Sequence, residues 1–176
     1  MLQMHLCFDP VLRETAAPVA VVDDAVRAIL SDMVAMMDAA AGVGLAAPQV
    51  GISQRFLVMR DIAGNREKGA EANAPLLKMI NPKITLRSSD NVVREEGCLS
   101  VLGPDSLPIY ADVTRPATVT VEWMDENGNT HVREFTDVAA CIIQHEIDHL
   151  DGILFIDYLP AAKREMVMSK VRKKKK

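Results

Sequence analysis

The segment CIIQHEIDHLDG, residues 141–152, restricts the possible folds of this chain more than any other. If it forms a helix, His145 and His149 lie one turn apart on one face, where both imidazoles can bind one metal ion. The neighbouring helix positions are largely apolar: Ile142, Ile143, Ile147 and Leu150. A helix of this composition is buried, and histidines on a buried helix need polar partners. The rest of the chain must therefore supply those partners.

Glu146 directly follows the first histidine, and from that position its carboxylate can reach a water bound to the metal. A metal ion lowers the pKa of such a water towards neutrality, and a nearby carboxylate can accept the proton and pass it to a leaving group. The spacing therefore indicates hydrolytic chemistry. The alternative is an exposed, charged helix that carries two histidines by coincidence, because a five-residue pattern also arises by chance.

A catalytic metal site usually has three protein ligands, and three residues could complete this one. Glu165 is the one glutamate after the motif and would give a zincin-type endopeptidase, although its helix is otherwise basic. Cys141 shares the histidine face, but three ligands in successive turns lie nearly in a line. Cys98 follows Gly97, which lets the backbone approach closely, yet a cysteine in a strand is also an ordinary core residue. The residues alone therefore do not decide which of the three is the third ligand. They also leave open a non-catalytic protein with a structural metal site.

Length and composition favour one compact domain over residues 1–176. Hydrophobic residues make up 49% of the chain, enough for a core without disulfides. The net charge of −4 argues against DNA or RNA as the main partner, because phosphate binding needs a basic face. The three cysteines lie far apart, which argues against a disulfide framework and favours the cytoplasm. Neither a signal peptide nor an apolar run of membrane-spanning length is recognisable, so no membrane partner is expected.

Periodicity and turn signals predict an α+β fold, with strands in the middle of the chain and helices near both ends. Helices are expected at about 24–41, at 137–151 and from residue 160 onwards. Strands are expected at 55–60, 76–86, 91–101, 118–125 and 130–137, with a short strand or extended segment at 153–157. Irregular chain is expected at 65–75 and 105–116.

Three segments, taken together and in this order, resemble the signature segments of the peptide deformylase family. They are GVGLAAPQVG at 42–51, EEGCLS at 95–100 and QHEIDHLDG at 144–152. The flanking DPVLRETAAPV and GILFIDYLP are also similar to family sequence, so the resemblance covers most of the chain. After EEGCLSV the family pattern continues with proline, whereas this chain has Leu102, a difference that concerns contacts to the peptide beyond methionine.

The resemblance implies a metal-dependent hydrolase that removes the formyl group from the N-terminal formylmethionine of newly synthesised proteins and releases formate. It implies that Cys98, His145 and His149 bind a divalent metal, with Glu146 as the general acid/base. Fe²⁺ is expected, and Zn²⁺, Ni²⁺ or Co²⁺ would also suit one thiolate with two imidazoles. The implied architecture has antiparallel or mixed sheets wrapped around a central metal-binding helix, with an N-terminal and a C-terminal helix.

Attack on a formamide creates a negatively charged oxygen, which needs hydrogen-bond donors. The resemblance assigns this role to the side-chain amide of Gln49 and the backbone N–H of Leu99. A substrate pocket that takes the methionine side chain is expected beside the metal helix. Its candidate residues, each of which could also be purely structural, are Val43, Gly44, Gly97, Val138, Cys141 and Ile142.

The C-terminal KVRKKKK is a local basic run in an acidic protein. One interpretation is a solvated helix end, where basic side chains interact favourably with the helix dipole. The other, implied by the same resemblance, is contact between the C-terminal helix and ribosomal RNA near the exit tunnel.

Overall fold

The computed structural model describes residues 2–62 and 73–174. Its helices are α1 (Asp24–Ala39), α2 (Asp137–Leu150) and α3 (Ala161–Lys174), with short 3₁₀ helices η1 (Pro10–Arg13), η2 (Ala47–Val50) and η4 (Phe155–Tyr158). Its strands are β1 (Gly44–Ala46), β2 (Phe56–Arg60), β3 (Leu76–Arg87), β4 (Asn91–Glu96), β5 (Ala111–Pro116), β6 (Thr118–Met124) and β7 (Thr130–Thr136). The predicted α+β fold is confirmed.

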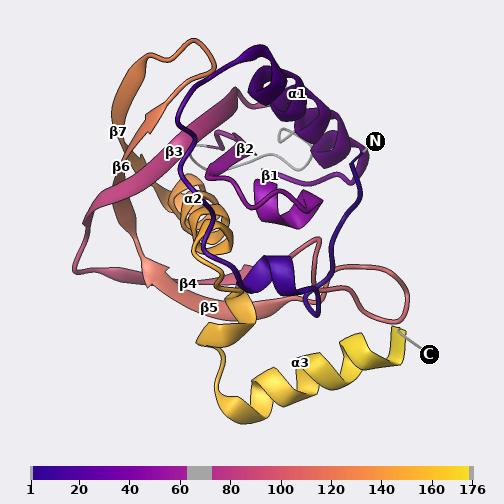
Figure 1. Cartoon of the computed structure of the whole chain (residues 1–176). Helices are drawn as coiled ribbons and strands as arrows, with labels where there is room; N and C mark the ends of the chain where they lie inside the picture. Colours follow the sequence, from indigo (N-terminus) through magenta and orange to yellow (C-terminus); the bar gives the residue numbers. More distant parts are fainter. Residues whose placement is uncertain (1, 63–72, 175–176) are drawn as a thin grey trace.

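The strands form two antiparallel sheets that enclose α2 (Figure 1). One sheet has five strands in the order β1-β2-β3-β6-β7, and the other consists of β4 and β5. The helix contacts strands of both sheets. It is therefore the central element around which the sheets wrap, as the resemblance implied, and its side chains are aimed at both.

Strand β2 shows why α1 and α2 cover opposite faces of the larger sheet. Side chains alternate between the two faces of a strand, and here both sets are apolar. Phe56 and Val58 pack with α1, whereas Leu57 and Met59 pack with α2. A strand that is buried on both faces reads as a continuous apolar run, as the sequence FLVMR does. The sheet is thus the middle layer between the two helices.

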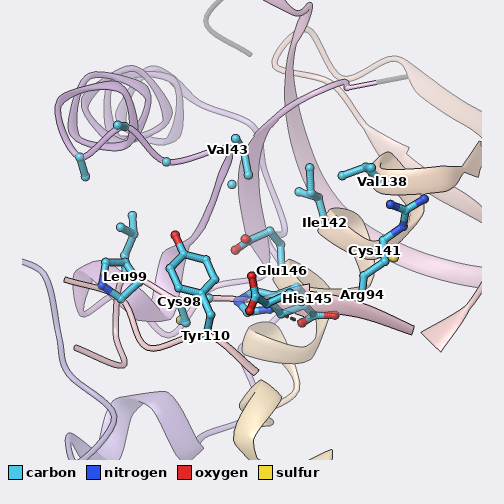
Figure 2. Close-up of a pocket in the computed structure, with 18 of the residues that line it drawn as sticks. Val43, Arg94, Cys98, Leu99, Tyr110, Val138, Cys141, Ile142, His145 and Glu146 are labelled. Carbon is cyan, nitrogen blue, oxygen red and sulfur yellow. Dashed lines mark hydrogen bonds and ion pairs between the residues drawn. The ribbon is translucent and has the colours of Figure 1, made fainter. Parts of the chain in front are cut away.

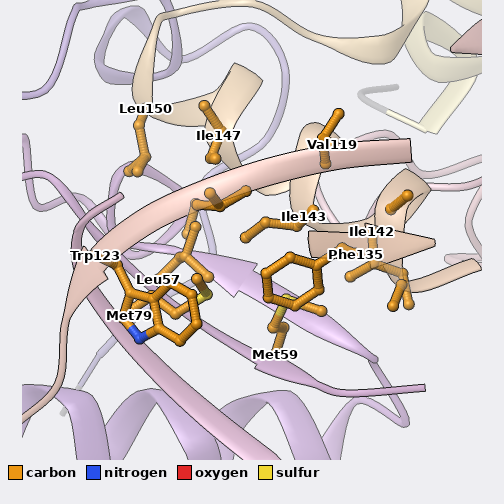
Figure 3. Close-up of a cluster of buried hydrophobic side chains, with 14 of the residues drawn as sticks. Leu57, Met59, Met79, Val119, Trp123, Phe135, Ile142, Ile143, Ile147 and Leu150 are labelled. Atoms are coloured by element: carbon orange, nitrogen blue, oxygen red, sulfur yellow. The ribbon is translucent and has the colours of Figure 1, made fainter. Parts of the chain in front are cut away.

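The main core lies between α2 and the larger sheet (Figure 3). From the helix, Ile143, Ile147 and Leu150 enter it, and each is at most 3% exposed. The sheet contributes large apolar side chains from several strands: Leu57, Met59, Met79, Val119, Val121, Trp123 and Phe135. Burying an aliphatic side chain of this size contributes about 1.5–3 kcal/mol. This packing fixes where α2 lies and therefore where its opposite face points.

The expectation of irregular chain over 105–116 is wrong for its second half, because 111–116 is strand β5. It pairs with β4 in a register that includes Glu96 opposite Ala111 and Arg94 opposite Val113. Its buried positions alternate as in any half-buried strand, but one of them is Arg115, which is 3% exposed. The apolar alternation typical of a strand is interrupted by Arg115, so the sequence did not predict β5. Arg115 can be buried only because distant residues form ion pairs with it.

Two further segments differ from expectation, since the strand expected at 91–101 ends at Glu96 and the segment 153–157 is not a strand. Residues 153–157 were expected to be extended, but 155–158 form η4, in which the Asp157 carboxylate accepts a hydrogen bond from the Leu154 N–H at 2.9 Å. Within GVGLAAPQVG, three residues form strand β1, which pairs with β2. The expected loop at 65–75 lies mostly outside the described residues. Within 2–62 and 73–174, the helices are too short or too polar to cross a lipid bilayer.

Candidate metal centre

Three potential metal ligands lie close together, two on α2 and one shortly after β4. One ligand atom each from Cys98, His145 and His149 can be chosen so that all three lie within 4.8 Å of one another. The Cys98 Sγ is 3.3 Å from His149 Nε2, and the two imidazole ring centroids are 5.0 Å apart. Cys98 follows the end of β4 and the histidines lie on α2, so the group exists only because α2 packs against the β4–β5 pair. The sequence signal on the histidines and the one on Cys98 thus belong to a single site. Figure 2 shows two of its members, Cys98 and His145.

The chemistry of these three residues fits a divalent transition metal. Burial and the neighbouring His145 hold the pKa of His149 well below its usual value, which keeps this imidazole neutral, as a ligand must be. The Cys98 sulfur accepts hydrogen bonds from the Ser100 N–H at 3.4 Å and the Gln49 amide at 3.6 Å, an environment that suits a thiolate. One thiolate with two imidazoles is a donor set that iron, zinc, cobalt and nickel accept.

Glu96 is a functional candidate that the sequence reading missed. The His145 Nδ1 lies 2.9 Å from Glu96 Oε2, so a proton on Nδ1 is donated to this carboxylate and Nε2 is left with a free lone pair. Burial lowers the pKa of His145, but hydrogen bonds to Cys98 and Glu96 outweigh it and hold the pKa well above its usual value, so an ion that binds here must displace the proton from Nε2. The available signal was the alternation along NVVREE, which places Glu96 on the buried face of β4. A buried carboxylate needs a hydrogen-bond donor, and for Glu96 one of these donors is His145, a potential metal ligand.

Arg115 holds the Glu96 carboxylate in place. Its guanidinium donates to both oxygens of Glu96, with Nη2 3.0 Å from Oε2, and Nη1 is 2.8 Å from Asp148 Oδ2. The guanidinium also lies 5.0 Å from the ring centroid of Tyr158. Burial raises the pKa of Glu96, yet the hydrogen bonds from His145 and Arg115 prevail and lower it. The result is a buried charge network that orients one imidazole of the metal group.

Glu146 lies beside the metal group with one oxygen free. Burial raises the pKa of this carboxyl to about 7, the range in which a side chain can both accept and return a proton near neutrality. Among the described residues no hydrogen-bond partner reaches its buried Oε2. A Cβ placed on Gly44 would overlap the Glu146 carboxylate, so only glycine lets β1 pass this close. The local geometry leaves Glu146 one oxygen with which to act on a bound molecule.

Gln49 and Leu99 approach the same group from other elements. The Gln49 Oε1 accepts a hydrogen bond from the Ala46 N–H at 2.8 Å, which turns the amide so that Nε2 faces Cys98 and the Ser100 hydroxyl, 3.2 Å away. Leu99 directly follows the cysteine and forms part of the wall of the adjoining cavity. Both residues line the cavity beside the metal group, and their role as donors to a substrate oxygen stays a prediction.

A cavity of about 470 Å³ opens from the metal group to the surface (Figure 2). All six residues expected for a substrate pocket line it: Val43, Gly44, Gly97, Val138, Cys141 and Ile142. The lining residues that the sequence did not suggest include Arg94, Pro108 and Tyr110. Gly97 is required here, because a Cβ at this position would overlap the Tyr110 ring. The cavity is large enough for an amino-acid side chain together with a short stretch of peptide.

The two rival ligands lie elsewhere. Glu165 is exposed on α3, where its carboxylate pairs with Arg172 at 2.7 Å, so a His₂Glu site of the zincin type is not formed. Cys141 is buried in the cavity wall and is not part of the convergent group. All three cysteines are free thiols. The third position of the group is therefore held by Cys98.

Comparison with known proteins agrees with this geometry. The model of the polypeptide deformylase family matches residues 1–165. The chain belongs to the peptide deformylase family. It is 44% identical to the peptide deformylase of Rhizobium meliloti (strain 1021) over 165 residues, which is 94% of this chain and 88% of that one. It is 46% identical to the peptide deformylase of Brucella suis biovar 1 over 94% of this chain and 88% of that one.

Solved structures of peptide deformylases share the fold. The crystal structure of the Ehrlichia chaffeensis peptide deformylase in complex with actinonin superposes with a TM-score of 0.88 at 36% identity, covering 100% of this chain and 98% of that one. The Synechococcus elongatus peptide deformylase, also in complex with actinonin, gives a TM-score of 0.83 at 38% identity, over 99% of this chain and 88% of that one. The family is one of metallohydrolases, in agreement with the cysteine and histidine group found here.

Proposed function

We propose that this chain hydrolyses the formamide of N-terminal formylmethionine on newly made proteins, using a divalent metal held by Cys98, His145 and His149. The observation that carries the proposal is the position of Glu146, whose free carboxylate oxygen lies next to a thiolate and imidazole group at the end of an open cavity. A structural metal site needs neither a free carboxylate nor a cavity. The products are formate and a free N-terminal amine.

The metal is Fe²⁺ in this proposal, with Zn²⁺, Ni²⁺ and Co²⁺ as ions that the same donors accept. When bound, such an ion supplies Lewis acidity, which lowers the pKa of a water towards neutrality and polarises a carbonyl oxygen. Oxidation of the Cys98 thiolate would remove a ligand, so exposure to oxygen should release iron. For this reason the protein is best purified anaerobically before its metal content is measured.

Glu146 moves the proton. In the proposed reaction its carboxylate takes a proton from the attacking water and delivers it to the amide nitrogen, so that the C–N bond breaks with a neutral amine as the leaving group. The carboxylate has no hydrogen bond at Oε2 among the described residues, and Gly44 leaves the backbone of β1 close beside it. The unpaired oxygen is available to the substrate, and the close backbone of β1 restricts the movement of the carboxylate.

Gln49 and Leu99 stabilise the negative charge that develops on the formyl oxygen. The Gln49 amide is already oriented by the Ala46 N–H, so its Nε2 is held on the side where the formyl oxygen would lie in this proposal. The backbone N–H of Leu99 is the second donor in the proposal. Removal of one donor of this kind typically costs about 2.7–4 kcal/mol of transition-state stabilisation.

The peptide lies along β4 in this proposal. In the described part of the chain β4 pairs only with β5, so its other edge can add an extended peptide as a further strand. That edge leads to Gly97, which lines the cavity together with the glycines and valine of GVGL. The methionine side chain enters the largely apolar part of the cavity formed by Val138, Cys141 and Ile142.

Assay of the anaerobically purified protein with formyl-Met-Ala-Ser tests the proposal directly. The expected result is one equivalent of formate and one free amine per peptide, with inhibition by actinonin. Substitution with cobalt should give an intense thiolate-to-metal absorption band, because Cys98 is a ligand. Absence of deformylation by a protein that contains stoichiometric metal would reject the proposed function.

We place the reaction in the cytoplasm, where formylated chains emerge from the ribosome. The C-terminal helix is the proposed contact with the ribosome. Only a few side chains of α3, Val167 and Val171 among them, pack into the core, so much of its surface is free. The proposal is that the basic residues of KVRKKKK contact ribosomal RNA. Deletion of residues 172–176, which spares the buried Val171, should weaken ribosome association at low salt more than at high salt, as sedimentation can measure. Association that is unchanged by the deletion would remove this part of the proposal.

A further inference from the structure

One charged side chain lies in the otherwise apolar end of the cavity. Arg94 comes from β4 and lines the cavity beside Val138, Cys141 and Ile142 (Figure 2). Its Nε is buried and has no hydrogen-bond partner among the described residues. In the same part of the chain no carboxylate lies within ion-pair distance of its guanidinium. Arg94 thus differs from Arg115, whose guanidinium is held by two carboxylates.

An arginine in the wall of a cavity without a carboxylate partner can bind a hydrogen-bond acceptor on a ligand. Arginine stays charged at any relevant pH, and a buried donor without an acceptor costs stability. Cys141 lines the cavity together with Arg94, and its sulfur is only a weak acceptor. A molecule that brings a strong oxygen acceptor to this point would satisfy the guanidinium and gain affinity.

The side chain of the formylated residue is the part of the substrate that reaches this end of the cavity, an assignment that rests on the proposed function. A methionine thioether is only a weak acceptor, whereas methionine sulfoxide has the same chain length and carries an oxygen on its sulfur. We propose that Arg94 adapts this pocket to a formylated residue with a neutral oxygen acceptor at the position of the methionine sulfur, and specifically to formyl-methionine sulfoxide. The enzyme would then deformylate chains whose first residue has been oxidised.

The acceptor is neutral rather than anionic because the cavity already contains negative charge. Glu95, Glu96 and Glu146 all line it. A carboxylate on the substrate side chain would gain one guanidinium but enter a cavity that acidic residues line, whereas a sulfoxide oxygen makes the same hydrogen bond with less repulsion. Methionine sulfoxide also keeps the terminal methyl group, which can pack against Val138 and Ile142 as in methionine.

The test compares three substrates that differ at one position of the side chain: formyl-Met-Ala-Ser, formyl-norleucine-Ala-Ser and formyl-methionine-sulfoxide-Ala-Ser. The metal-loaded enzyme and its Arg94→Leu variant are assayed on each. The ratio of kcat/KM for the sulfoxide to that for norleucine should fall roughly 10- to 100-fold in Arg94→Leu, the range expected when a hydrogen bond to a charged group is lost. Arg94→Lys, which retains a charged donor, should keep part of the preference.

Arg87→Leu is the matched control, because Arg87 is an exposed strand arginine outside the cavity. It should leave the ratio unchanged. A second readout is binding of the deformylated products, where Arg94→Leu should weaken Met-sulfoxide-Ala-Ser relative to norleucine-Ala-Ser by a similar factor. This measurement does not depend on turnover.

The outcomes separate the two proposals. Wild-type enzyme that deformylates none of the three substrates rejects the proposed function. Enzyme that deformylates formyl-Met-Ala-Ser but shows the same sulfoxide-to-norleucine ratio in wild type and Arg94→Leu rejects only the role of Arg94. If formyl-Glu-Ala-Ser is preferred over the sulfoxide, the neutral acceptor is wrong and the pocket selects an anion instead.

Discussion

The two faces of α2 bury different kinds of side chain, apolar on one face and polar on the other. The face towards the larger sheet presents Ile143, Ile147 and Leu150 to a dry apolar core (Figure 3). The face towards the cavity presents His145 and His149, with Glu146 beside them, and all three polar side chains are buried. The first face contributes stability through burial of apolar surface. The second costs stability, because buried polar groups without full hydrogen bonding are unfavourable.

The apolar face of α2 offsets the loss of stability caused by the buried polar groups on its other face. Packing on one face fixes the helix, and the helix then carries the polar groups of the other face at fixed spacing. His145 and His149 illustrate a finer contrast, because Glu96 holds Nδ1 of the former, whereas Nδ1 of the latter has no partner among the described residues. One imidazole is oriented by charge and the other by packing. Substitutions should therefore separate chemistry from stability according to the face that they change.

The largest effect is expected for Cys98→Ala, which removes the one proposed ligand that does not come from α2. Two imidazoles alone hold a divalent ion far less tightly than a group with a thiolate, so both metal and activity should be lost. Metal analysis after dialysis and the formate assay measure the two losses. Full activity with stoichiometric metal would show that the ligand assignment is wrong.

Glu146→Ala should remove proton transfer and spare the ligands. We expect kcat to fall by about 10²- to 10⁴-fold with metal content near that of wild type. Glu165→Ala is the control, since this glutamate is exposed on α3 and paired only with Arg172. Full activity in Glu146→Ala would reject its role in proton transfer, and loss of bound metal in Glu165→Ala would revive the zincin-type interpretation.

Ile143→Ala tests the other face of the helix. This side chain is 0% exposed, and its truncation should lower the free energy of unfolding by about 2–5 kcal/mol. Below the unfolding transition kcat should change little, because no polar group of the site is altered. Denaturant unfolding and the activity assay give the two values. Val132→Ala, at a position 64% exposed, should shift stability by no more than about 0.5 kcal/mol.

The smallest effect of the four is expected for Glu96→Gln, which keeps the shape but removes the charge that orients His145. Metal affinity should fall by about 10- to 100-fold, as is typical when the hydrogen-bond partner of a ligand is altered. Competition with a chelator measures this directly. An unchanged affinity would mean that packing alone orients both imidazoles, and the contrast between them would disappear.

The sequence predicted most elements because their signals are local. Apolar spacing located α1, two-sided burial located β2, and the HEIDH spacing placed the two histidines on one helix face. The side-chain oxygen of Asp23 accepts from the Val26 N–H at 2.9 Å, as expected of a helix cap. What the sequence could not show is the partner of a charged residue. Arg115 concealed β5, and Glu96 and Arg94 drew no attention, because their significance depends on residues that only the fold brings near.

The third ligand shows the same limit in another form. From spacing alone, Cys98 could not be told from an ordinary core cysteine, and only its match with two other segments singled it out. The structure supplies the missing fact, which is that the end of β4 faces α2. Glycine signals were clearer, since Gly44 and Gly97 both lie where a side chain would collide with a neighbour.

Cys98 and His149 are separated by 51 positions in the chain, and the unfolded polypeptide cannot hold one ion between them with comparable affinity. Any ion that these residues bind therefore acts as a removable cross-link on the folded form, worth about 4 kcal/mol when free metal exceeds its dissociation constant a thousandfold. Scarcity of metal in a cell would do more than silence the enzyme. It would open the polypeptide to proteases, so that the abundance of the protein would follow the supply of its ion.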